Sequence, residues 1–134
     1  MRALIAVLIL VGCGGPPAAD CVSPCGMRAY GTEDCDGLAM AEARVLAAFG
    51  DRLECQQLRG WALSVAITDL HAIGREGQTW CDFHGVPIRT DDWARSAYAH
   101  ELAHVQQCPC IIDYSHATWT WQWEAIRQAN EVSP

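Results

Sequence analysis

The sequence predicts a small, disulfide-stapled α+β domain in which a short antiparallel sheet packs on a helix. The chain has 134 residues, enough for one hydrophobic core and not comfortably for two. It carries eight cysteines, a density typical of disulfide-stabilised domains in oxidising compartments. Its apolar residues alternate in the middle of the chain and recur at helical spacing on either side, which indicates strands between helices.

Residues 1–12 have the layout of a secretory signal peptide. Arg2 supplies a positive charge, and residues 3–11 form an unbroken apolar run. As a helix this run would span roughly 14 Å, about half of a bilayer core, so it is too short to be a transmembrane helix. We therefore expect export of the chain across the inner membrane.

The four residues Leu-Val-Gly-Cys that end at Cys13 are similar to the bacterial lipobox. The resemblance implies cleavage before Cys13, a lipid on its thiol and an anchored protein at the periplasmic face of a membrane or the cell surface. Residues 13–20, rich in Gly and Pro, then form a flexible tether, and residues 21–134 form a single domain. An acylated Cys13 leaves an odd number of cysteines for pairing, whereas an unmodified one allows four bridges.

Residues 20–37 have the composition of a loop, and three cysteines can staple it. Its acidic cluster lacks the EF-hand spacing, which favours a solvated loop over a calcium site. Residues 38–49 predict a helix, because helix formers dominate them and their apolar side chains share one face. Gly50 follows at the position of a C-terminal cap.

Three extended segments follow, and we expect them to form a small antiparallel sheet. Residues 61–70 alternate between apolar and polar or small side chains, the pattern of a strand with one buried face. A Gly-Arg-Glu-Gly turn separates this strand from two shorter ones, at residues 79–83 and 85–88.

Two helices complete the predicted fold. Thr90 or Asp91 can cap a helix that Pro109 stops. Residues 117–130 hold three alternate tryptophans, which suit a strand as well as a helix, but the composition of the last half favours a helix throughout.

The helix before Pro109 contains the main functional signal, His100-Glu101-Leu-Ala-His104. Residues four apart lie on one face of a helix, so the two imidazoles can share a zinc ion at about 2.1 Å each. Glu101 is rotated about 100° from His100 and can reach a water at the metal without binding the metal itself. A chance match arises roughly once in a hundred such chains, but the helical setting and the export signal both favour a zinc site.

The longer string His-Glu-Leu-Ala-His-Val-Gln-Gln resembles the active-site helix of the zincin metallopeptidases. The resemblance implies a zincin-like domain that hydrolyses peptide bonds with a zinc-activated water, with Glu101 as general base and then as proton donor to the leaving amine. It also implies that an edge strand before the helix, at residues 79–82 or 85–88, pairs with an extended peptide or protein substrate.

A zincin needs a third protein ligand, and the sequence offers several. The metzincin arrangement is not met, because Gln107 and Cys110 stand where that group has glycine and its third histidine. Gluzincins use a glutamate on a later helix, and Glu124 in Trp-Gln-Trp-Glu-Ala is similar to it, so Glu124 is the preferred third ligand. His116 and Asp113 are the alternatives, since the loop after the helix can also return to the metal.

Other roles have more than one candidate. An oxyanion donor is needed, and Tyr98, Tyr114 and His116 are available. A free Cys108 or Cys110 thiolate is a minor alternative for the metal, since zinc binds thiolates well.

Disulfide connectivity cannot be read from sequence, but a bridge from Cys81 to Cys108 or Cys110 would pin a strand to the end of the helix. The alternative to an enzyme is a non-catalytic periplasmic lipoprotein that binds zinc or a partner on the same scaffold. The small size of the domain favours that alternative, whereas Glu101 favours catalysis. The net charge of −7, with scattered basic residues, argues against a nucleic-acid partner.

Overall fold

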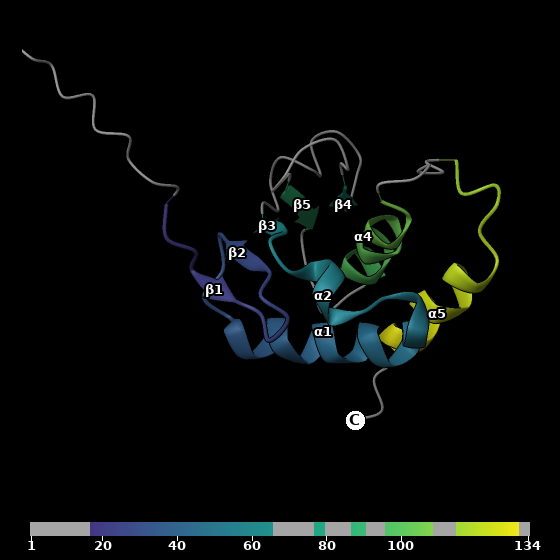
Figure 1. The fold of residues 1–134 in the computed structure, drawn as a ribbon, viewed down its shortest axis with the longest axis horizontal. Helices are drawn as coiled ribbons and strands as arrows, with labels where there is room; N and C mark the ends of the chain where they lie inside the picture. Colours follow the sequence, from purple (N-terminus) through teal and green to yellow (C-terminus); the bar gives the residue numbers. More distant parts are fainter. Residues whose placement is uncertain (1–16, 66–76, 80–86, 91–95, 109–114, 132–134) are drawn as a thin grey trace, which may run out of the picture.

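The computed structural model describes residues 17–65, 77–79, 87–90, 96–108 and 115–131. They form a mixed α+β fold in which helices and a small sheet surround a shared hydrophobic core (Figure 1). The predicted signal peptide, Cys13 and the first part of the tether lie outside the described residues. Within the described part, no helix combines the length and the apolar character that a membrane span requires.

Within the described residues, the strands form one five-stranded sheet in the order β1-β2-β3-β5-β4. The strands are β1 (Cys21–Val22), β2 (Arg28–Tyr30), β3 (Ala62–Val65), β4 (Gly77–Gln78) and β5 (Pro87–Thr90). The three inner strands run parallel to one another, and the two edge strands, β1 and β4, are antiparallel to their neighbours.

The predicted wholly antiparallel sheet is therefore wrong. β3 pairs with β5 in parallel, with Leu63 opposite Ile88, and only β4 joins β5 in the antiparallel sense. Alternation along a strand indicates which face is buried but carries no information on strand direction. Direction depends on the connections, and the segment between Val65 and Pro87 is long enough for the crossover that a parallel pair needs.

β1 and β2 lie in the segment that was expected to be a loop. Each is too short to show a repeating pattern, and β2 becomes a strand by pairing with β3, where Ala29 lies opposite Leu63. Disulfides nevertheless staple this segment, as predicted, and they join Cys21 to Cys35 and Cys25 to Cys55.

The predicted helix at residues 38–49 is confirmed as α1 (Cys35–Phe49), which lies along the base of the molecule in Figure 1. It begins earlier than predicted because Asp34, one of the loop carboxylates, caps it by accepting a hydrogen bond of 2.9 Å from the Gly37 N–H. At the other end Gly50 has a φ of 57°, which glycine adopts readily, and its N–H donates to the Leu46 carbonyl.

A short 3₁₀ turn and a one-turn helix, η1 (Gly50–Arg52) and α2 (Cys55–Leu58), connect α1 to β3. The two other predicted helices occur as α4 (Ser96–Gln107) and α5 (Trp121–Asn130), but the second is shorter than predicted, because residues 117–120 lie in a turn before it. Thr90 is not the cap of α4, because it is the last residue of β5.

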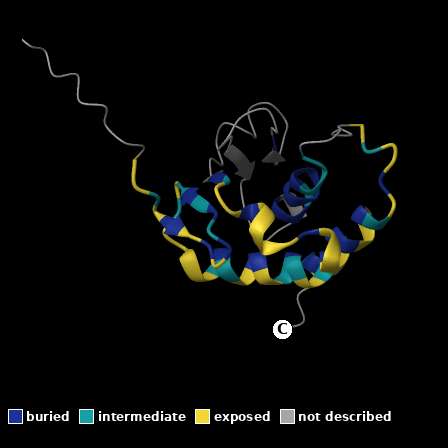
Figure 2. Ribbon diagram, in the orientation of Figure 1, coloured by how far each residue is buried: buried dark blue, intermediate teal, exposed yellow. Residues whose placement is uncertain are grey.

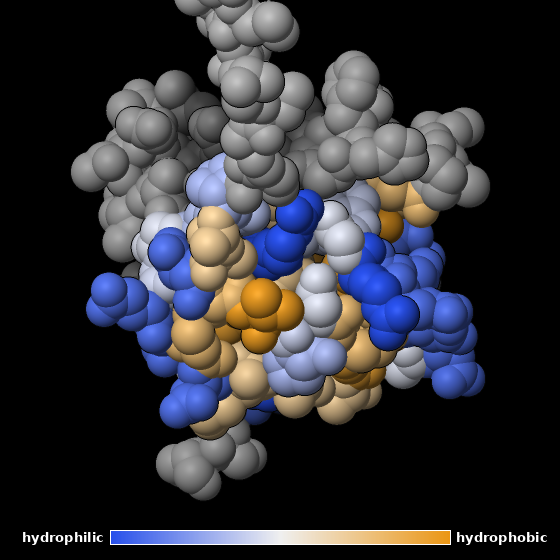
Figure 3. All heavy atoms as spheres, turned by 60° about the vertical axis from the view of Figure 1, so that its left-hand side comes forward, coloured by the Kyte–Doolittle hydropathy of each residue, from blue (hydrophilic) through white to orange (hydrophobic). Residues whose placement is uncertain are grey.

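α1 packs against both α5 and α4, and α4 also contacts β4 and β5. From Tyr98 to Val105 every side chain of α4 is buried except that of His100, which is half-buried (Figure 2). α4 is thus an interior helix, and polar groups on it are held by the surrounding elements rather than by solvent. Figure 3 shows one outer face, on which apolar and hydrophilic side chains are mixed.

Candidate metal centre

His100 and His104 lie on one face of α4, as their spacing predicts. Their ring centroids are 5.1 Å apart, and His104 is buried whereas His100 is partly open to solvent. The face that carries them is turned toward the chain between α4 and α5 and toward the first turn of α5, because His100 contacts Trp119 and Trp123.

His116 completes a group of three histidines. Its ring centroid lies 4.7 Å from that of His100 and 5.1 Å from that of His104, and its Nε2 is 3.2 Å from the His104 Nε2. A turn holds it there, in which the Trp119 N–H donates to the His116 carbonyl at 3.2 Å. His116 has a φ of 59°, an uncommon backbone conformation for a residue with a side chain.

The three histidines lie close enough to bind a metal ion, since one nitrogen of each lies within 4.8 Å of the others. Two nitrogens bound to one zinc at about 2.1 Å and the tetrahedral angle are roughly 3.4 Å apart. The observed Nε2–Nε2 distance of 3.2 Å between His104 and His116 is close to this value, although an N–H···N hydrogen bond has a similar length. The residues present therefore fit a metal site with three imidazole ligands.

The surroundings of His104 and His100 also favour the neutral imidazoles that a metal requires. Nδ1 of His104 lies 3.4 Å from the Gln107 Oε1, so a proton on Nδ1 leaves the Nε2 lone pair directed at His116. Burial, and to a smaller extent the nearby rings of His104 and His116, lower the pKa of His100 to about 4. His100 is therefore neutral near pH 7, as a metal ligand must be.

Glu124, the preferred third ligand, is not brought to this group. It lies on the exposed side of α5, where its carboxylate accepts hydrogen bonds from Arg127 at 3.0 Å and from Gln128 at 2.8 Å. These hydrogen bonds lower the pKa of Glu124 to about 2. The opposite face of α5, which includes Ala125 and Ile126, is the buried one, so the helix turns Glu124 toward solvent.

The structure decides the role of two of the other candidate ligands and oxyanion donors, Cys108 and Tyr98. Cys108 is disulfide-bonded, so it offers no free thiolate. Tyr98 is wholly buried in the core rather than at the site, and burial together with the Glu42 carboxylate raises its pKa well above the ordinary value. Asp113 and Tyr114 lie outside the described residues, as do Cys81 and Cys110.

The Glu101 carboxylate contacts the residue that follows β4. The Glu101 side chain is buried, and its Oε2 lies 2.5 Å from the hydroxyl of Thr79, the residue after β4. Glu101 is not among the groups whose ligand atoms converge, which agrees with a role other than metal ligand.

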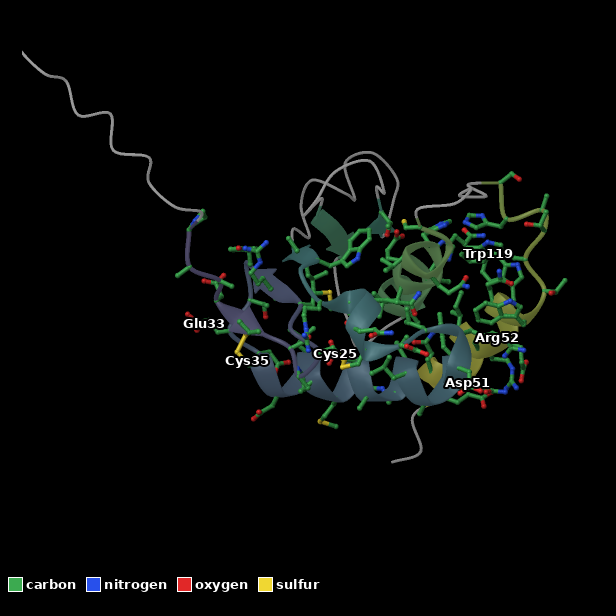
Figure 4. All side chains as sticks on the ribbon, in the orientation of Figure 1. Cys25, Glu33, Cys35, Asp51, Arg52 and Trp119 are labelled. Carbon is green, nitrogen blue, oxygen red and sulfur yellow. A yellow bond between two sulfur atoms is a disulfide. The ribbon has the colours of Figure 1, made fainter. Side chains whose placement is uncertain are left out.

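Trp119 contacts all three histidine rings, with centroid distances of 5.0 Å to His100, 4.8 Å to His104 and 4.4 Å to His116. Its indole is buried, and its Nε1–H has no hydrogen-bond partner among the described residues. Trp119 is labelled in Figure 4. The ring of Trp123, which is 46% exposed, lies next to that of Trp119, with a centroid distance of 5.2 Å.

The sequence placed Thr79 in an expected edge strand but indicated no role at the histidine site for the side chains of Trp119, Thr79 or Gln107. Gln107 could have been found, since it lies three residues after His104 on the same helix and within reach of the second imidazole nitrogen. Nothing in the sequence relates Thr79 to Glu101, because that contact depends on how the sheet packs against α4.

Comparison with models of known protein families, with curated proteins and with solved structures yields no match to this chain.

Proposed function

We propose that this protein is a zinc-dependent peptidase of the zincin type, with zinc held by His100, His104 and His116. The convergence of these three imidazoles supports the proposal most strongly, because catalytic zinc sites combine three protein ligands with one open position. Zinc is favoured over other metals because a set of three neutral imidazoles is one of its known catalytic ligand sets.

When bound, zinc would supply the chemistry of a Lewis acid, polarising a peptide carbonyl and lowering the pKa of a water molecule. Glu101 accepts the proton of the attacking water and passes it to the leaving amine. Its burial and its hydrogen bond from Thr79 hold the carboxylate in one orientation, which is what a general base requires.

The substrate-binding element in this proposal is β4. It is an edge strand of the described sheet, antiparallel to β5, and it contacts α4. A peptide that paired with its free side would be bound through main-chain hydrogen bonds, next to the helix that carries the histidines. Trp123, exposed beside His100 and His116, would contact side chains of such a peptide.

Export and lipid attachment through Cys13 are part of the same proposal. The two disulfides among the described residues support an oxidising compartment, since such bonds rarely persist in the cytosol. The signal-like residues 1–12 supply the export route.

One observation favours the second candidate, a non-catalytic zinc-binding protein. Trp119 is buried against all three histidine rings, so it restricts access to the metal from its side. A site that binds zinc without hydrolysing peptides would have this property.

Zinc content measured by mass spectrometry tests the metal site. We expect about one zinc per chain in the wild-type protein and in Glu124→Gln, and little in His116→Ala. The reverse result for the two variants would return the third-ligand role to Glu124. Zinc-dependent cleavage of a quenched peptide library by the wild-type chain, and its loss in Glu101→Gln with zinc retained, then separates the peptidase from the zinc-binding alternative.

A further inference from the structure

Thr79 links the edge strand of the sheet to the predicted general base. It directly follows Gln78, the last residue of β4, and its hydroxyl lies 2.5 Å from the Glu101 Oε2 and 3.2 Å from the Glu101 carbonyl oxygen. Thr79 is 2% exposed and Glu101 4%, so water does not compete for either group. A buried hydroxyl therefore connects two elements that are 22 residues apart in sequence.

The hydroxyl proton is directed at the carboxylate. A threonine hydroxyl has one proton and two possible acceptors here. The contact of 2.5 Å with Oε2 has the length of a charge-assisted O–H···O⁻ bond, whereas the 3.2 Å contact with the carbonyl is weaker. The carboxylate of Glu101 is consequently bound by a donor from the residue that follows β4.

We propose that Thr79 is a positioning residue that sets the orientation of Glu101 and couples it to peptide pairing at β4. This inference rests on the proposed function. Gly77 and Gln78 use one side of β4 to pair with Thr90 and Arg89 of β5, and no other strand among the described residues pairs with β4, so an added strand would pair with its other side. Because Thr79 is the next residue in the chain, a peptide paired with β4 would lie one residue from the hydroxyl that holds the base.

The test uses the full zinc-loaded chain and two substitutions at one position. Thr79→Val removes the hydroxyl and keeps the shape of the side chain, whereas Thr79→Ser keeps the hydroxyl. With an internally quenched peptide library as the substrate, we expect Thr79→Val to lower kcat roughly tenfold to a hundredfold with KM within about twofold of wild type. Thr79→Ser should restore most of kcat.

Ser23→Ala is the matched control. Ser23 is also buried, and its hydroxyl accepts a hydrogen bond of 3.1 Å from the Met27 N–H, between β1 and β2 and remote from the histidines. Loss of this hydroxyl should lower stability without changing kcat. A fall in kcat in Ser23→Ala as large as that in Thr79→Val would show a general effect of destabilisation and would overturn the inference.

A second measurement does not depend on activity. Urea midpoints of zinc-free Thr79→Val, Glu101→Ala and the double variant form a double-mutant cycle. We expect Thr79→Val to shift the midpoint less when Glu101 is already replaced. Additive shifts would overturn the contact on which the inference depends.

The two failures can be told apart. Cleavage by the wild-type chain with an unchanged kcat in Thr79→Val overturns the positioning role and leaves the proposed peptidase intact. Absence of zinc-dependent cleavage by the wild-type chain overturns the proposed function and the inference together.

Discussion

The Nε2 atoms of His104 and His116 lie 3.2 Å apart, although the two residues are separated by 12 positions and come from different elements. One is buried in α4, and the other lies in a turn before α5 with a left-handed backbone conformation. Two imidazole nitrogens directed at each other at this distance need either a shared proton or a shared metal ion.

Removal of zinc should lower the thermal stability of the chain. A ligand at one hundred times its dissociation constant stabilises the folded state by about 2.7 kcal/mol, so chelation should lower Tm by several degrees. His104→Ala should have a lower Tm that no longer responds to zinc or to EDTA. Calorimetric scans with and without zinc provide the measurement, and an equal response of the two proteins would contradict the site.

The zinc-free protein should lose stability as the pH falls through the titration range of His100. Its pKa is lowered from 6.5 to about 4, mainly by burial, so the unfolded chain binds more protons than the folded chain between these values. Stability therefore falls between pH 6.5 and about pH 4, and His100→Gln should remove that part of the slope. Urea midpoints of the wild-type chain and of His100→Gln, measured across this pH range, test the prediction. The same slope of stability against pH in both proteins would contradict it.

Glu124 should not contribute to the change in stability between pH 6.5 and pH 4.5. Its pKa is lowered from 4.5 to about 2, so any stability from its pairing with Arg127 is present above pH 4.5 and is lost below it. Glu124→Gln is thus a control for the His100 experiment, since its effect on the pH slope should be confined to pH values below 4.5.

Replacement of Tyr98 by Phe should leave stability unchanged or raise it. Its hydroxyl is fully buried and has no hydrogen-bond partner among the described residues, so deletion removes a desolvated group rather than a bond. Glu42→Leu should instead cost about 1–3 kcal/mol, because the Cys25 N–H donates to the Glu42 carboxylate at 2.9 Å in the core. A loss in Tyr98→Phe as large as that in Glu42→Leu would show that the hydroxyl is bonded.

The two disulfides that join described cysteines should differ in their contribution to stability. The Cys25–Cys55 bridge closes a separation of 30 residues and the Cys21–Cys35 bridge one of 14. Loop-closure entropy then makes the longer bridge about 0.7 kcal/mol more stabilising. Double Cys→Ser variants of each pair, compared by urea denaturation, test this, and a larger loss from the shorter loop would contradict the entropic argument.

Much of the helical structure was predictable from local patterns. α1 and α4 occur where helix formers and apolar spacing indicate them, and Gly50 caps α1 as expected. The sheet was less predictable. β1 and β2 are too short to show a period, and the parallel pairing of β3 with β5 depends on connections that alternation does not encode.

The third histidine of the group was also not predictable from local patterns. Glu124 was preferred on resemblance to a later helix that carries a glutamate, but α5 is amphipathic and turns that side chain outward to Arg127. His116, the alternative, lies in a turn whose path no helical or strand period describes.

The sequence by itself determined that His100 and His104 share a face, because a helix relates residues four apart whatever surrounds it. Its eight cysteines also indicated a disulfide-stapled domain. Only the tertiary structure decided that His116 and Trp119 meet this pair and that Thr79 binds Glu101. These contacts depend on the path of the turn before α5 and on how the sheet packs against α4. Both result from the packing of the whole core rather than from a local sequence period.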